Sequence, residues 1–380
     1  MRIVHIFLIC LLFLTFCARK LENEADSEHV NIDPLRLQAA QIVSSMNNRL
    51  LAAQTIISGI DGREYLSSNM IELLTEIPTG GIMLFRYNLN ADNETIRSFL
   101  GETSSLIGVE CGIYPFFAVD HEGGRVTRFR HDVASLPSAF SYWELYQSEG
   151  IDVALEKIEE DSFKAGLELN WFGINMNFAP VAEHTIDENR VFLQTRSYGP
   201  DPYFAAKAST AFMRGMELAG IICVVKHFPG NAGPDPHFSA SVLDVDRTAL
   251  DILISPFLYN INNGARAMMA AHTLVPLIDN KIASFSSVKM GDWLRGELGF
   301  NGIIISDDFL MAAVGNISPE EAAVRSIIAG SDMILVWPAY LKKTYEAITA
   351  ALEDGRLSQE RLQDAAQRII YEKLKMGLML

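Results

Sequence analysis

Short runs of apolar and β-branched residues recur along the chain, and each is bounded by Gly, Pro, Asn or Asp. Runs of this length are typical of strands that are buried on both faces of a sheet. The pattern predicts eight strands, at Thr55–Ile60, Gly81–Phe85, Phe116–Asp120, Asn175–Ala179, Cys223–Phe228, Ala267–His272, Gly302–Asp307 and Asp332–Val336. Near-continuous apolar strands favour a parallel sheet.

Helical patterns lie between the predicted strands. Apolar residues recur with helical spacing over Leu155–Leu169 and Ala205–Leu218. A last helix begins after an N-cap at Ser358 and carries Lys373 and Lys375 near its negative end. Strands that alternate with helices predict an α/β fold, here a single (β/α)8 TIM-type barrel. An open doubly wound sheet is the alternative, but no G-x-G-x-x-G turn follows an early strand.

Length, composition and charge are compatible with one large soluble domain. The chain has 380 residues, of which 49% are hydrophobic, so it can bury a large core. Its 31 Lys and Arg residues stand against 47 Asp and Glu residues, for a formal net charge of −16. Because this charge repels phosphate backbones and anionic membrane surfaces, we expect no nucleic-acid partner.

The first residues have the pattern of an export signal. Arg2 and His5 precede the apolar run Ile6–Phe16, which is too short to span a bilayer as a permanent helix. Cys17 closes that run, as the lipidated cysteine does in a lipoprotein signal, although Phe16 is bulkier than the usual residue before it. We predict a signal peptide over residues 1–17, either of lipoprotein type or ordinarily cleaved, with an uncleaved anchor as the remaining alternative.

The rest of the chain divides into a tether and a catalytic domain. Residues 18–34 are polar and lack apolar periodicity, which predicts a flexible tether, and residues 35–380 form the barrel. We therefore expect an exported protein, periplasmic or held at a membrane only through its N-terminal lipid. Cys111 and Cys223 are too few and too distant to indicate a disulfide framework, and Cys223 lies inside an apolar run.

Polar residues follow several of the predicted strands at the point where each strand ends. Asp120 ends the third strand, Lys226 and His227 lie in the fifth, and His272 and Asp307 end the sixth and seventh. The C-terminal ends of barrel strands meet at one rim, where barrel enzymes build their active sites. These side chains therefore predict a functional site at that rim.

Each such residue also has a purely structural explanation. Asp308 would cap the helix after the seventh strand, and Glu122 would pair with Arg125 or Arg128. Glycines follow the third and fifth strands and would let the backbone approach a ligand closely. A phosphate-binding loop is the competing use of such glycines, but the sequence contains no G-x-x-x-x-G-K-[ST] pattern.

Seven short motifs occur in a fixed order along the chain. They are Gly80–Phe85, Val119–Val126, Asn177–Val181, Arg196–Gly199, Lys226–Gly230, Ala271–His272 and Leu294–Leu310. Together they resemble glycoside hydrolase family 3, in particular its compact bacterial β-N-acetylglucosaminidases of the NagZ type. The resemblance runs from about Leu50 to Leu380 and implies a sugar-cleaving barrel.

The resemblance also implies roles for individual residues. Asp307 matches the family's catalytic nucleophile, the first aspartate of its S/T-D-D/A motif. The matching positions that would hold the sugar in the −1 subsite are Asp120, Arg196, Lys226 and His227, and Arg125 and His272 belong to the same set of motifs.

In this branch of the family the acid/base is a histidine in an Asp-x-His pair on the loop after Lys-His-Phe-Pro-Gly. Asp235 and His237 supply that pair here. The loop departs from the family pattern, because Asp235 lies closer to Gly230 than usual, Asn231 and Ala232 replace His-Gly, and a proline replaces the serine between the pair. Prolines at 234 and 236 would make this shorter loop stiffer, so the reach of His237 is left open. The competing interpretation of Asp235 and His237 is that they are ordinary polar loop residues.

Retaining hydrolysis needs these residue types. A carboxylate attacks the anomeric carbon and a proton donor assists the leaving oxygen, through a covalent glycosyl-enzyme. The positive charge of Lys226 would favour the ionised form of Asp307. His237 would donate the proton and later take one from water, with Asp235 orienting its ring. A neutral histidine repels anions less than a carboxylate does, so phosphate could replace water as the acceptor.

A metal-dependent barrel is the alternative among enzymes. Asp120, His121, His227 and His272 could hold a metal, but such barrels carry a His-x-His on an early strand, which is absent here. We expect no metal and no cofactor.

The sequence thus predicts a retaining exo-acting β-N-acetylhexosaminidase, which releases terminal N-acetylglucosamine from wall-derived or chitin-like oligosaccharides. One alternative is a catalytically weak sugar-binding lipoprotein. Another is a β-glucosidase, which we disfavour because those relatives take their acid/base from a second domain.

Overall fold

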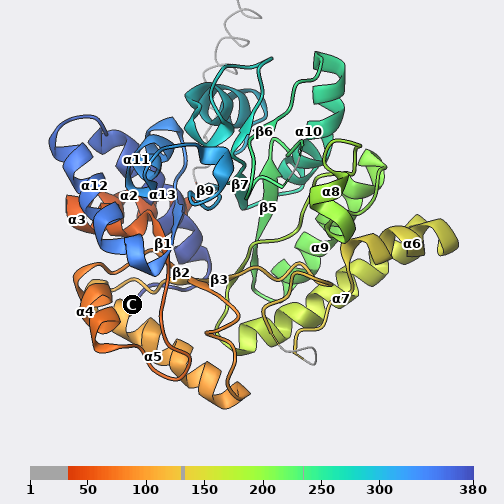
Figure 1. Ribbon diagram of the computed structural model, residues 1–380. Helices are drawn as coiled ribbons and strands as arrows, with labels where there is room; N and C mark the ends of the chain where they lie inside the picture. The colour runs from red at the N-terminus through yellow and green to blue at the C-terminus, as the bar shows by residue number, and fades with distance from the viewer. Residues whose placement is uncertain (1–32, 130–132, 234) are drawn as a thin grey trace, which may run out of the picture.

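The computed structural model describes residues 33–129, 133–233 and 235–380. Its centre is an eight-stranded sheet in which hydrogen-bonded neighbours follow the order β10-β1-β2-β3-β4-β5-β7-β9, all parallel. Figure 1 shows the strands at the centre of the molecule with helices around them. The strands are β1 (Ile56–Gly59), β2 (Gly81–Leu84), β3 (Phe116–Val119), β4 (Met176–Asn177), β5 (Ile222–Phe228), β7 (Ala267–Ala270), β9 (Ile303–Ser306) and β10 (Ile334–Val336).

The two ends of this strand order lie next to each other. Ile305 of β9 forms an isolated parallel bridge with Met333, directly before β10. The backbone N–H of Ser306 donates to the Met333 carbonyl at 3.0 Å. These contacts bring the sheet nearly to full closure, so the predicted barrel is confirmed. Each of the eight predicted strands overlaps one strand of the barrel.

Helices connect successive strands and cover the outside of the barrel. Most begin at a Ser, Asp or Asn whose side chain caps the first turn, such as Asp246 before α10 and Ser318 before α11. The two helical patterns expected from the sequence lie within α7 and α9. The helices are α2 (Pro34–Ser45), α3 (Asn48–Gln54), α4 (Ser68–Glu76), α5 (Asn93–Cys111), α6 (Ala139–Glu149), α7 (Ile151–Trp171), α8 (Arg190–Leu193), α9 (Pro202–Leu218), α10 (Arg247–Asn262), α11 (Pro319–Ala329), α12 (Leu341–Glu353) and α13 (Gln359–Lys375).

Shorter elements occur in the connections. A second sheet pairs β6 (Ser241–Val242) in parallel with β8 (Thr273–Leu274), and the sequence pattern did not predict it. Because β6 follows β5 and β8 follows β7, the pair joins two loops at the C-terminal end of the barrel. The remaining segments are the π-helix η3 (Val288–Glu297) and the 3₁₀ helices η1 (Gln194–Arg196), η2 (Ala283–Phe285), η4 (Ala312–Val314) and η5 (Pro338–Tyr340).

The core has two layers because side chains alternate between the faces of each strand. Ile57 and Phe116 belong to a cluster that fills the inside of the barrel. Their neighbours Ile56 and Phe117 belong to the larger cluster between strands and helices. Burial on both faces explains the near-continuous apolar runs in the sequence.

The last helix begins and ends as predicted. The Ser358 hydroxyl accepts a hydrogen bond from the Arg361 backbone at 3.1 Å, and Lys373 and Lys375 lie in the last turn. The side chain of Lys373 is nevertheless fully buried. Its Nζ donates to Gln54 Oε1 at 2.8 Å and lies 5.1 Å from the ring centre of Phe116. Since Phe116 begins β3, this lysine sits at the N-terminal end of the barrel, opposite the strand ends that carry the predicted site.

The predicted signal peptide, residues 1–17, lies outside the described residues, as does most of the predicted tether. The last two residues of the predicted tether, Asp33 and Pro34, are described. Asp33 caps helix α2, and Pro34 is the first residue of that helix. Within the described part of the chain, none of the helices has the length and apolar character needed to cross a membrane. Cys111 and Cys223 are free thiols, and Cys223 is buried as expected.

Candidate active site

Asp307 lies directly after β9, at the C-terminal rim of the barrel. Its backbone N–H donates to the Ala270 carbonyl at 3.3 Å, which ties it to the end of β7. Its Oδ1 accepts the backbone N–H of Asp308 at 2.8 Å. The side chain is partly exposed. Asp307 therefore presents a carboxylate with a fixed orientation to the space above the strands.

Asp308 does not cap a helix, so the structural explanation considered for it is wrong. Its Oδ1 accepts the backbone N–H of Leu310 at 2.9 Å, within a turn. Its Oδ2 accepts the indole Nε1–H of Trp337, which follows β10, at 2.8 Å. The next α-helix, α11, takes its cap from Ser318 instead. Asp308 thus joins the segment that carries Asp307 to the end of the neighbouring strand.

A network of buried charges occupies the ends of β3 and β5. Lys226 Nζ lies 2.9 Å from Asp120 Oδ1 and 2.7 Å from Glu122 Oε1. Arg196 donates two hydrogen bonds to the Glu122 carboxylate, both at 2.8 Å, and Arg128 donates to Asp120 Oδ2 at 2.8 Å. Two carboxylates and three cations therefore hold one another in place, with Asp120 partly exposed.

This network keeps its members ionised. Burial by itself would lower the pKa of Lys226, but Asp120 and Glu122 outweigh it and raise that pKa. Burial would likewise raise the pKa of Glu122, yet Arg196 and Lys226 hold it well below its ordinary range. Lys226 was expected to act on Asp307. Its ion-pair partners among the described residues are Asp120 and Glu122.

His227 is oriented by a residue that the sequence interpretation missed. Its Nδ1 lies 2.6 Å from Glu183 Oε1, and both side chains are buried. Glu183 also accepts the backbone N–H of Asn231 at 2.6 Å and its side-chain amide at 3.2 Å. One carboxylate thus holds both His227, which was predicted to bind the sugar, and the first residue of the loop that carries His237.

The loop after β5 brings the predicted acid/base pair together. His237 Nδ1 lies 2.6 Å from Asp235 Oδ1, and the same oxygen accepts the His237 backbone N–H at 3.0 Å. These hydrogen bonds lower the pKa of Asp235 against the opposing effect of burial. Because Nδ1 faces the carboxylate, Nε2 is the ring atom available to exchange a proton with a substrate. The His237 side chain is 55% exposed at the rim.

The tip of this loop rests on the segment that follows Asp307. Backbone N–H groups of Ala312 and Ala313 donate to the carbonyls of His237 and Pro236, both at 3.2 Å. The ring of Phe192 lies 6.5 Å from that of His237 and carries the Arg196 guanidinium on its face at 4.9 Å. The shorter loop is therefore hydrogen-bonded to the segment that follows Asp307.

The base of the loop is closed by hydroxyl and amide hydrogen bonds. Ser241 Oγ contacts both the N–H and the carbonyl of Ala232, at 3.1 Å each. Thr273 lies 2.9 Å from Ser241 Oγ and donates to Asn231 Oδ1 at 3.1 Å. Asn231, which replaces the family's histidine, thereby links the loop to Glu183 and to β8. Pro234 lies outside the described residues.

The wider sequence comparison decides the family. A family model described as the glycosyl hydrolase family 3 N terminal domain matches residues 47–371. The chain belongs to glycosyl hydrolase family 3. A β-hexosaminidase of Neisseria gonorrhoeae is 36% identical over 265 residues, which cover 68% of this chain and 71% of that protein.

Solved structures of family 3 members share the fold. A β-N-acetylglucosaminidase from Paenibacillus has a TM-score of 0.82 at 31% identity, and the match covers 88% of this chain and 63% of that one, less than two thirds of its length. NagZ of Neisseria gonorrhoeae, in complex with N-trifluoroacetyl-D-glucosamine, has a TM-score of 0.71 at 28% identity, covering 84% of this chain and 89% of that one.

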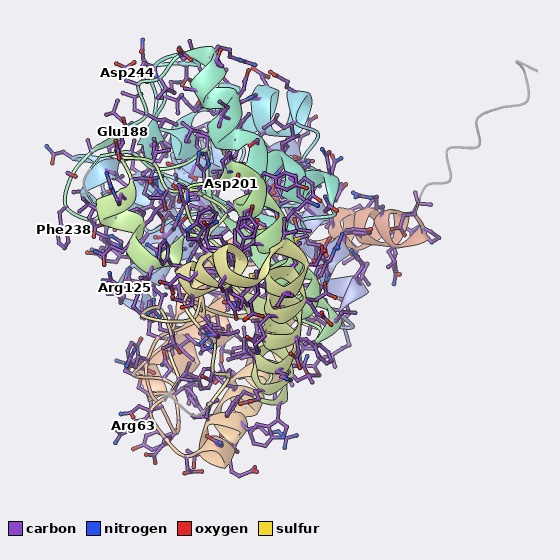
Figure 2. All side chains as sticks on the ribbon, turned by 90° about the vertical axis from the view of Figure 1, so that its right-hand side faces the viewer. Arg63, Arg125, Glu188, Asp201, Phe238 and Asp244 are labelled. Atoms are coloured by element: carbon purple, nitrogen blue, oxygen red, sulfur yellow. The ribbon has the colours of Figure 1, made fainter. Side chains whose placement is uncertain are left out.

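In this family 3 barrel the loop after β3 carries Arg125 and Arg128, and their partners differ from those that we expected. Arg125 is exposed at the rim, where its guanidinium donates to the side chain of Gln194. Figure 2 shows Arg125 on the same side of the molecule as Glu188 and Phe238, which follow β4 and β5. Arg128 holds Asp120 instead, and Glu122 pairs with neither of the arginines we considered for it. Arg128 and Glu122 thus belong to the charge network, and the predicted set of site residues did not include them.

Two histidines near the site are buried and make hydrogen bonds within the protein. His272 is buried, with Nδ1 2.8 Å from Ser284 Oγ and Nε2 3.1 Å from the Asp308 carbonyl, so it supports the Asp307 segment from below. Burial lowers its pKa, which keeps it neutral at pH 7. His121 is buried with Nε2 2.6 Å from the Ala134 carbonyl.

The residues considered for a metal site point to different partners. His121, His227 and His272 contact Ala134, Glu183 and Ser284 respectively. Within residues 33–129, 133–233 and 235–380, no group of three or more His, Cys, Asp or Glu side chains is arranged to hold a metal ion.

Proposed function

We propose that this glycoside hydrolase is a retaining, exo-acting β-N-acetylhexosaminidase that releases terminal N-acetylglucosamine from wall-derived or chitin-like oligosaccharides. One observation carries the proposal, namely that the loop bearing the Asp235–His237 pair is hydrogen-bonded to the segment following Asp307. This contact supports a pairing of Asp307 as the nucleophile with His237 as the acid/base. The names of relatives, β-hexosaminidase and β-N-acetylglucosaminidase, support the sugar class.

In the first step Asp307 attacks the anomeric carbon of the bound sugar. The bond from that carbon to the leaving oxygen breaks as the bond to an Asp307 oxygen forms, and His237 Nε2–H gives its proton to the leaving oxygen. Before that transfer the imidazole carries a proton on both nitrogens and is positively charged. The carboxylate of Asp235, 2.6 Å from Nδ1, balances this charge. The pair works as a carboxylate and histidine do in a hydrolase triad.

In the second step the imidazole has become a base. It takes a proton from water, whose oxygen attacks the anomeric carbon and displaces Asp307. The product keeps the β configuration after two inversions. The charge network holds the sugar during both steps, with Asp120 and His227 accepting or donating hydrogen bonds to hydroxyl groups at positions fixed by Lys226 and Glu183.

Release of p-nitrophenol from p-nitrophenyl N-acetyl-β-glucosaminide tests the proposal. We expect turnover by the wild type, strong preference over the matching β-glucoside, and loss of activity in Asp307→Asn, which keeps the size of the side chain but removes its nucleophilic charge. Full activity in Asp307→Asn would refute the assignment. Calorimetric binding of N-acetylglucosamine with every aryl glycoside left intact would favour the sugar-binding alternative instead.

We also propose that the protein is exported and held at a membrane through Cys17. The support is the sequence pattern of residues 1–17 and the polar stretch that follows it. Metabolic labelling with a radioactive fatty acid tests the lipid. Label in the wild type and none in Cys17→Ala is the expected result, whereas an unlabelled, soluble wild type would show ordinary cleavage.

A further inference from the structure

The chain at the end of β7 makes contacts on both of its sides. In the sheet β7 lies between β5, which leads to the acid/base loop, and β9, which leads to Asp307. The Ala270 carbonyl accepts the backbone N–H of Asp307 at 3.3 Å. The backbone N–H of Ala271, one residue on, donates to the Phe228 carbonyl of β5 at 2.8 Å. We call residues 270–273 the spacer, because they lie between the elements that lead to the proposed nucleophile and to the acid/base.

The two side chains that end the spacer continue this alternation. His272 Nε2 lies 3.1 Å from the Asp308 carbonyl, on the side of the nucleophile. Thr273 Oγ1 donates to Asn231 Oδ1 at 3.1 Å and lies 2.9 Å from Ser241 Oγ, on the side of the acid/base loop. Successive side chains therefore contact opposite sides, as they do along a strand. One short segment thus supports both halves of the catalytic pair.

The contact on the nucleophile's side has a defined donor. Burial lowers the pKa of His272, which keeps its ring neutral. Because a carbonyl can only accept, the ring carries its hydrogen on Nε2 and donates to Asp308. Nδ1 is then an acceptor, and the hydroxyl of Ser284, 2.8 Å away, donates to it. Ser284 is fully buried, so its hydroxyl fixes the tautomer that holds Asp308.

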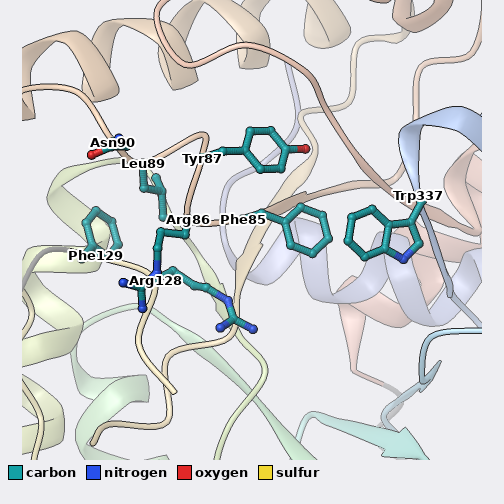
Figure 3. Close-up of a pocket in the computed structure, with 8 residues that line it drawn as sticks. All are labelled: Phe85, Arg86, Tyr87, Leu89, Asn90, Arg128, Phe129 and Trp337. Atoms are coloured by element: carbon teal, nitrogen blue, oxygen red, sulfur yellow. The ribbon is translucent and has the colours of Figure 1, made fainter. Parts of the chain in front are cut away.

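Asp308 is also held from its other side. Its Oδ2 accepts the indole Nε1–H of Trp337, and its backbone N–H donates to Asp307 Oδ1, both at 2.8 Å. Figure 3 shows Trp337 beside Phe85, on which it stacks with ring centroids 4.5 Å apart. The residue next to the nucleophile is thus fixed from the ends of both neighbouring strands, β7 and β10.

The contact on the acid/base side is part of a buried polar group. Asn231, Ser241 and Thr273 are 5%, 2% and 0% exposed. Ser241 Oγ also contacts the N–H and the carbonyl of Ala232, which ties the start of the loop to the spacer. Removing the Thr273 hydroxyl would leave the Asn231 amide oxygen buried without this donor. A buried polar atom that loses its partner is costly, so the loop would shift to regain one.

We propose that the spacer sets the separation between Asp307 and His237, with Thr273 and Ser284 as positioning residues on its two sides. This inference rests on the proposed function. Retaining hydrolysis needs the nucleophile and the acid/base at a defined separation across the anomeric carbon. Thr273 acts through the acid/base loop, and Ser284 acts through His272 on the nucleophile. Neither takes part in a chemical step.

Two leaving groups separate these effects. Phenol needs the proton of His237 to depart and 2,4-dinitrophenol does not, whereas both need attack by Asp307. We expect Thr273→Val to lower kcat/KM about tenfold for phenyl N-acetyl-β-glucosaminide, the scale of one hydrogen bond, and to spare the 2,4-dinitrophenyl glycoside. Ser241→Ala removes the partner of Thr273 on the loop and should give the same profile. Ser284→Ala should lower kcat/KM for both glycosides by the same factor.

Two further variants exclude a general loss of structure. Thr273→Ser keeps the hydroxyl and should restore turnover of the phenyl glycoside. Thr210 on the outer helix α9 is also buried and donates to an amide oxygen, Asn260 Oδ1, at 3.3 Å. Thr210→Val therefore loses a comparable hydrogen bond away from the site and should turn over both glycosides as the wild type does.

Three results would overturn the inference and leave the proposed function intact. They are no loss or equal losses on the two glycosides in Thr273→Val, a Thr273→Ser variant as slow as Thr273→Val, and a loss in Ser284→Ala that is confined to the phenyl glycoside. A wild type that leaves even the 2,4-dinitrophenyl glycoside intact would instead remove the proposed function.

Discussion

His227 and Glu183 lie 44 residues apart in the sequence and share a buried hydrogen bond of 2.6 Å between Nδ1 and Oε1. The same carboxylate binds Asn231, at the start of the loop that carries His237. Glu183 thus connects His227 to the loop that carries His237, and in the proposed mechanism it positions both without taking part in a chemical step.

Glu183→Gln should therefore lower kcat/KM by at least about tenfold, because a neutral amide holds the imidazole more weakly than a charge-assisted hydrogen bond does. The neighbouring Glu188 is exposed on the same loop, and Glu188→Gln serves as the control. Steady-state kinetics with p-nitrophenyl N-acetyl-β-glucosaminide measure the effect. Equal activity of both variants would contradict a positioning role for Glu183.

The acid/base assignment predicts a dependence on the leaving group. His237→Ala should lose about 10²- to 10⁴-fold in rate with a poor leaving group such as a sugar, and much less with 2,4-dinitrophenol, which departs without protonation. Added azide should restore the second step. Phe238→Ala is the control, since that side chain is 84% exposed beside His237. A uniform loss across leaving groups would point to a structural role.

Arg196 tests the charge network. Arg196→Lys keeps the positive charge but cannot make the two parallel hydrogen bonds to Glu122. We expect kcat/KM to fall about tenfold. The fall should come mainly from a higher KM, because the network is proposed to bind the sugar. Arg190→Lys, on the exposed part of the same segment, should behave as wild type. A loss confined to kcat would show that Arg196 acts on the transition state.

Lys373 predicts a pH dependence of stability. Burial lowers its pKa from 10.5 to about 7. The unfolded chain therefore binds a proton that the folded protein releases, so stability should rise between about pH 7 and pH 10, by up to about 1.4 kcal/mol per pH unit. Lys373→Met removes this dependence at the cost of leaving Gln54 without its donor.

Urea unfolding at pH 7, 8.5 and 10 measures that dependence. The stability of Lys373→Met, measured as its free energy of unfolding minus that of the wild type, should be highest at pH 7. This difference should fall as pH rises, because the wild type becomes more stable and the variant does not. The more exposed Lys375, two residues along, gives the control Lys375→Met, whose difference from wild type should not change with pH. A constant difference for Lys373→Met would show that the lysine stays charged in the fold.

The barrel was predictable because its signals are local. A strand buried on both faces gives an apolar run whatever its partners, and Asp120, Lys226 and Asp307 mark where three such runs end. The predicted placement of these residues at one rim is confirmed by the strand order. The small sheet of β6 and β8 was missed because two-residue strands leave no periodicity to detect.

The parts of the site that escaped prediction depend on tertiary contacts. The sequence around Arg125 does not distinguish it from Arg128. Gly123 and Gly124 form a turn with positive φ values of 93° and 54°, and the path of the chain after this turn determines which arginine faces inward. Glu183 could have been noticed as an acid shortly after a strand end. Its partner, however, is set by the packing of β4 beside β5.

The central claim is that Asp307 forms a covalent bond to the sugar. Incubation with 5-fluoro-N-acetylglucosaminyl fluoride, followed by proteolysis and mass spectrometry, tests it most directly, because the fluorine slows the second step and lets the glycosyl-enzyme accumulate. We predict one labelled peptide with the sugar on Asp307, and none in Asp307→Asn. A sugar on another residue, or turnover with no labelled enzyme and an inverted first product, would contradict the account.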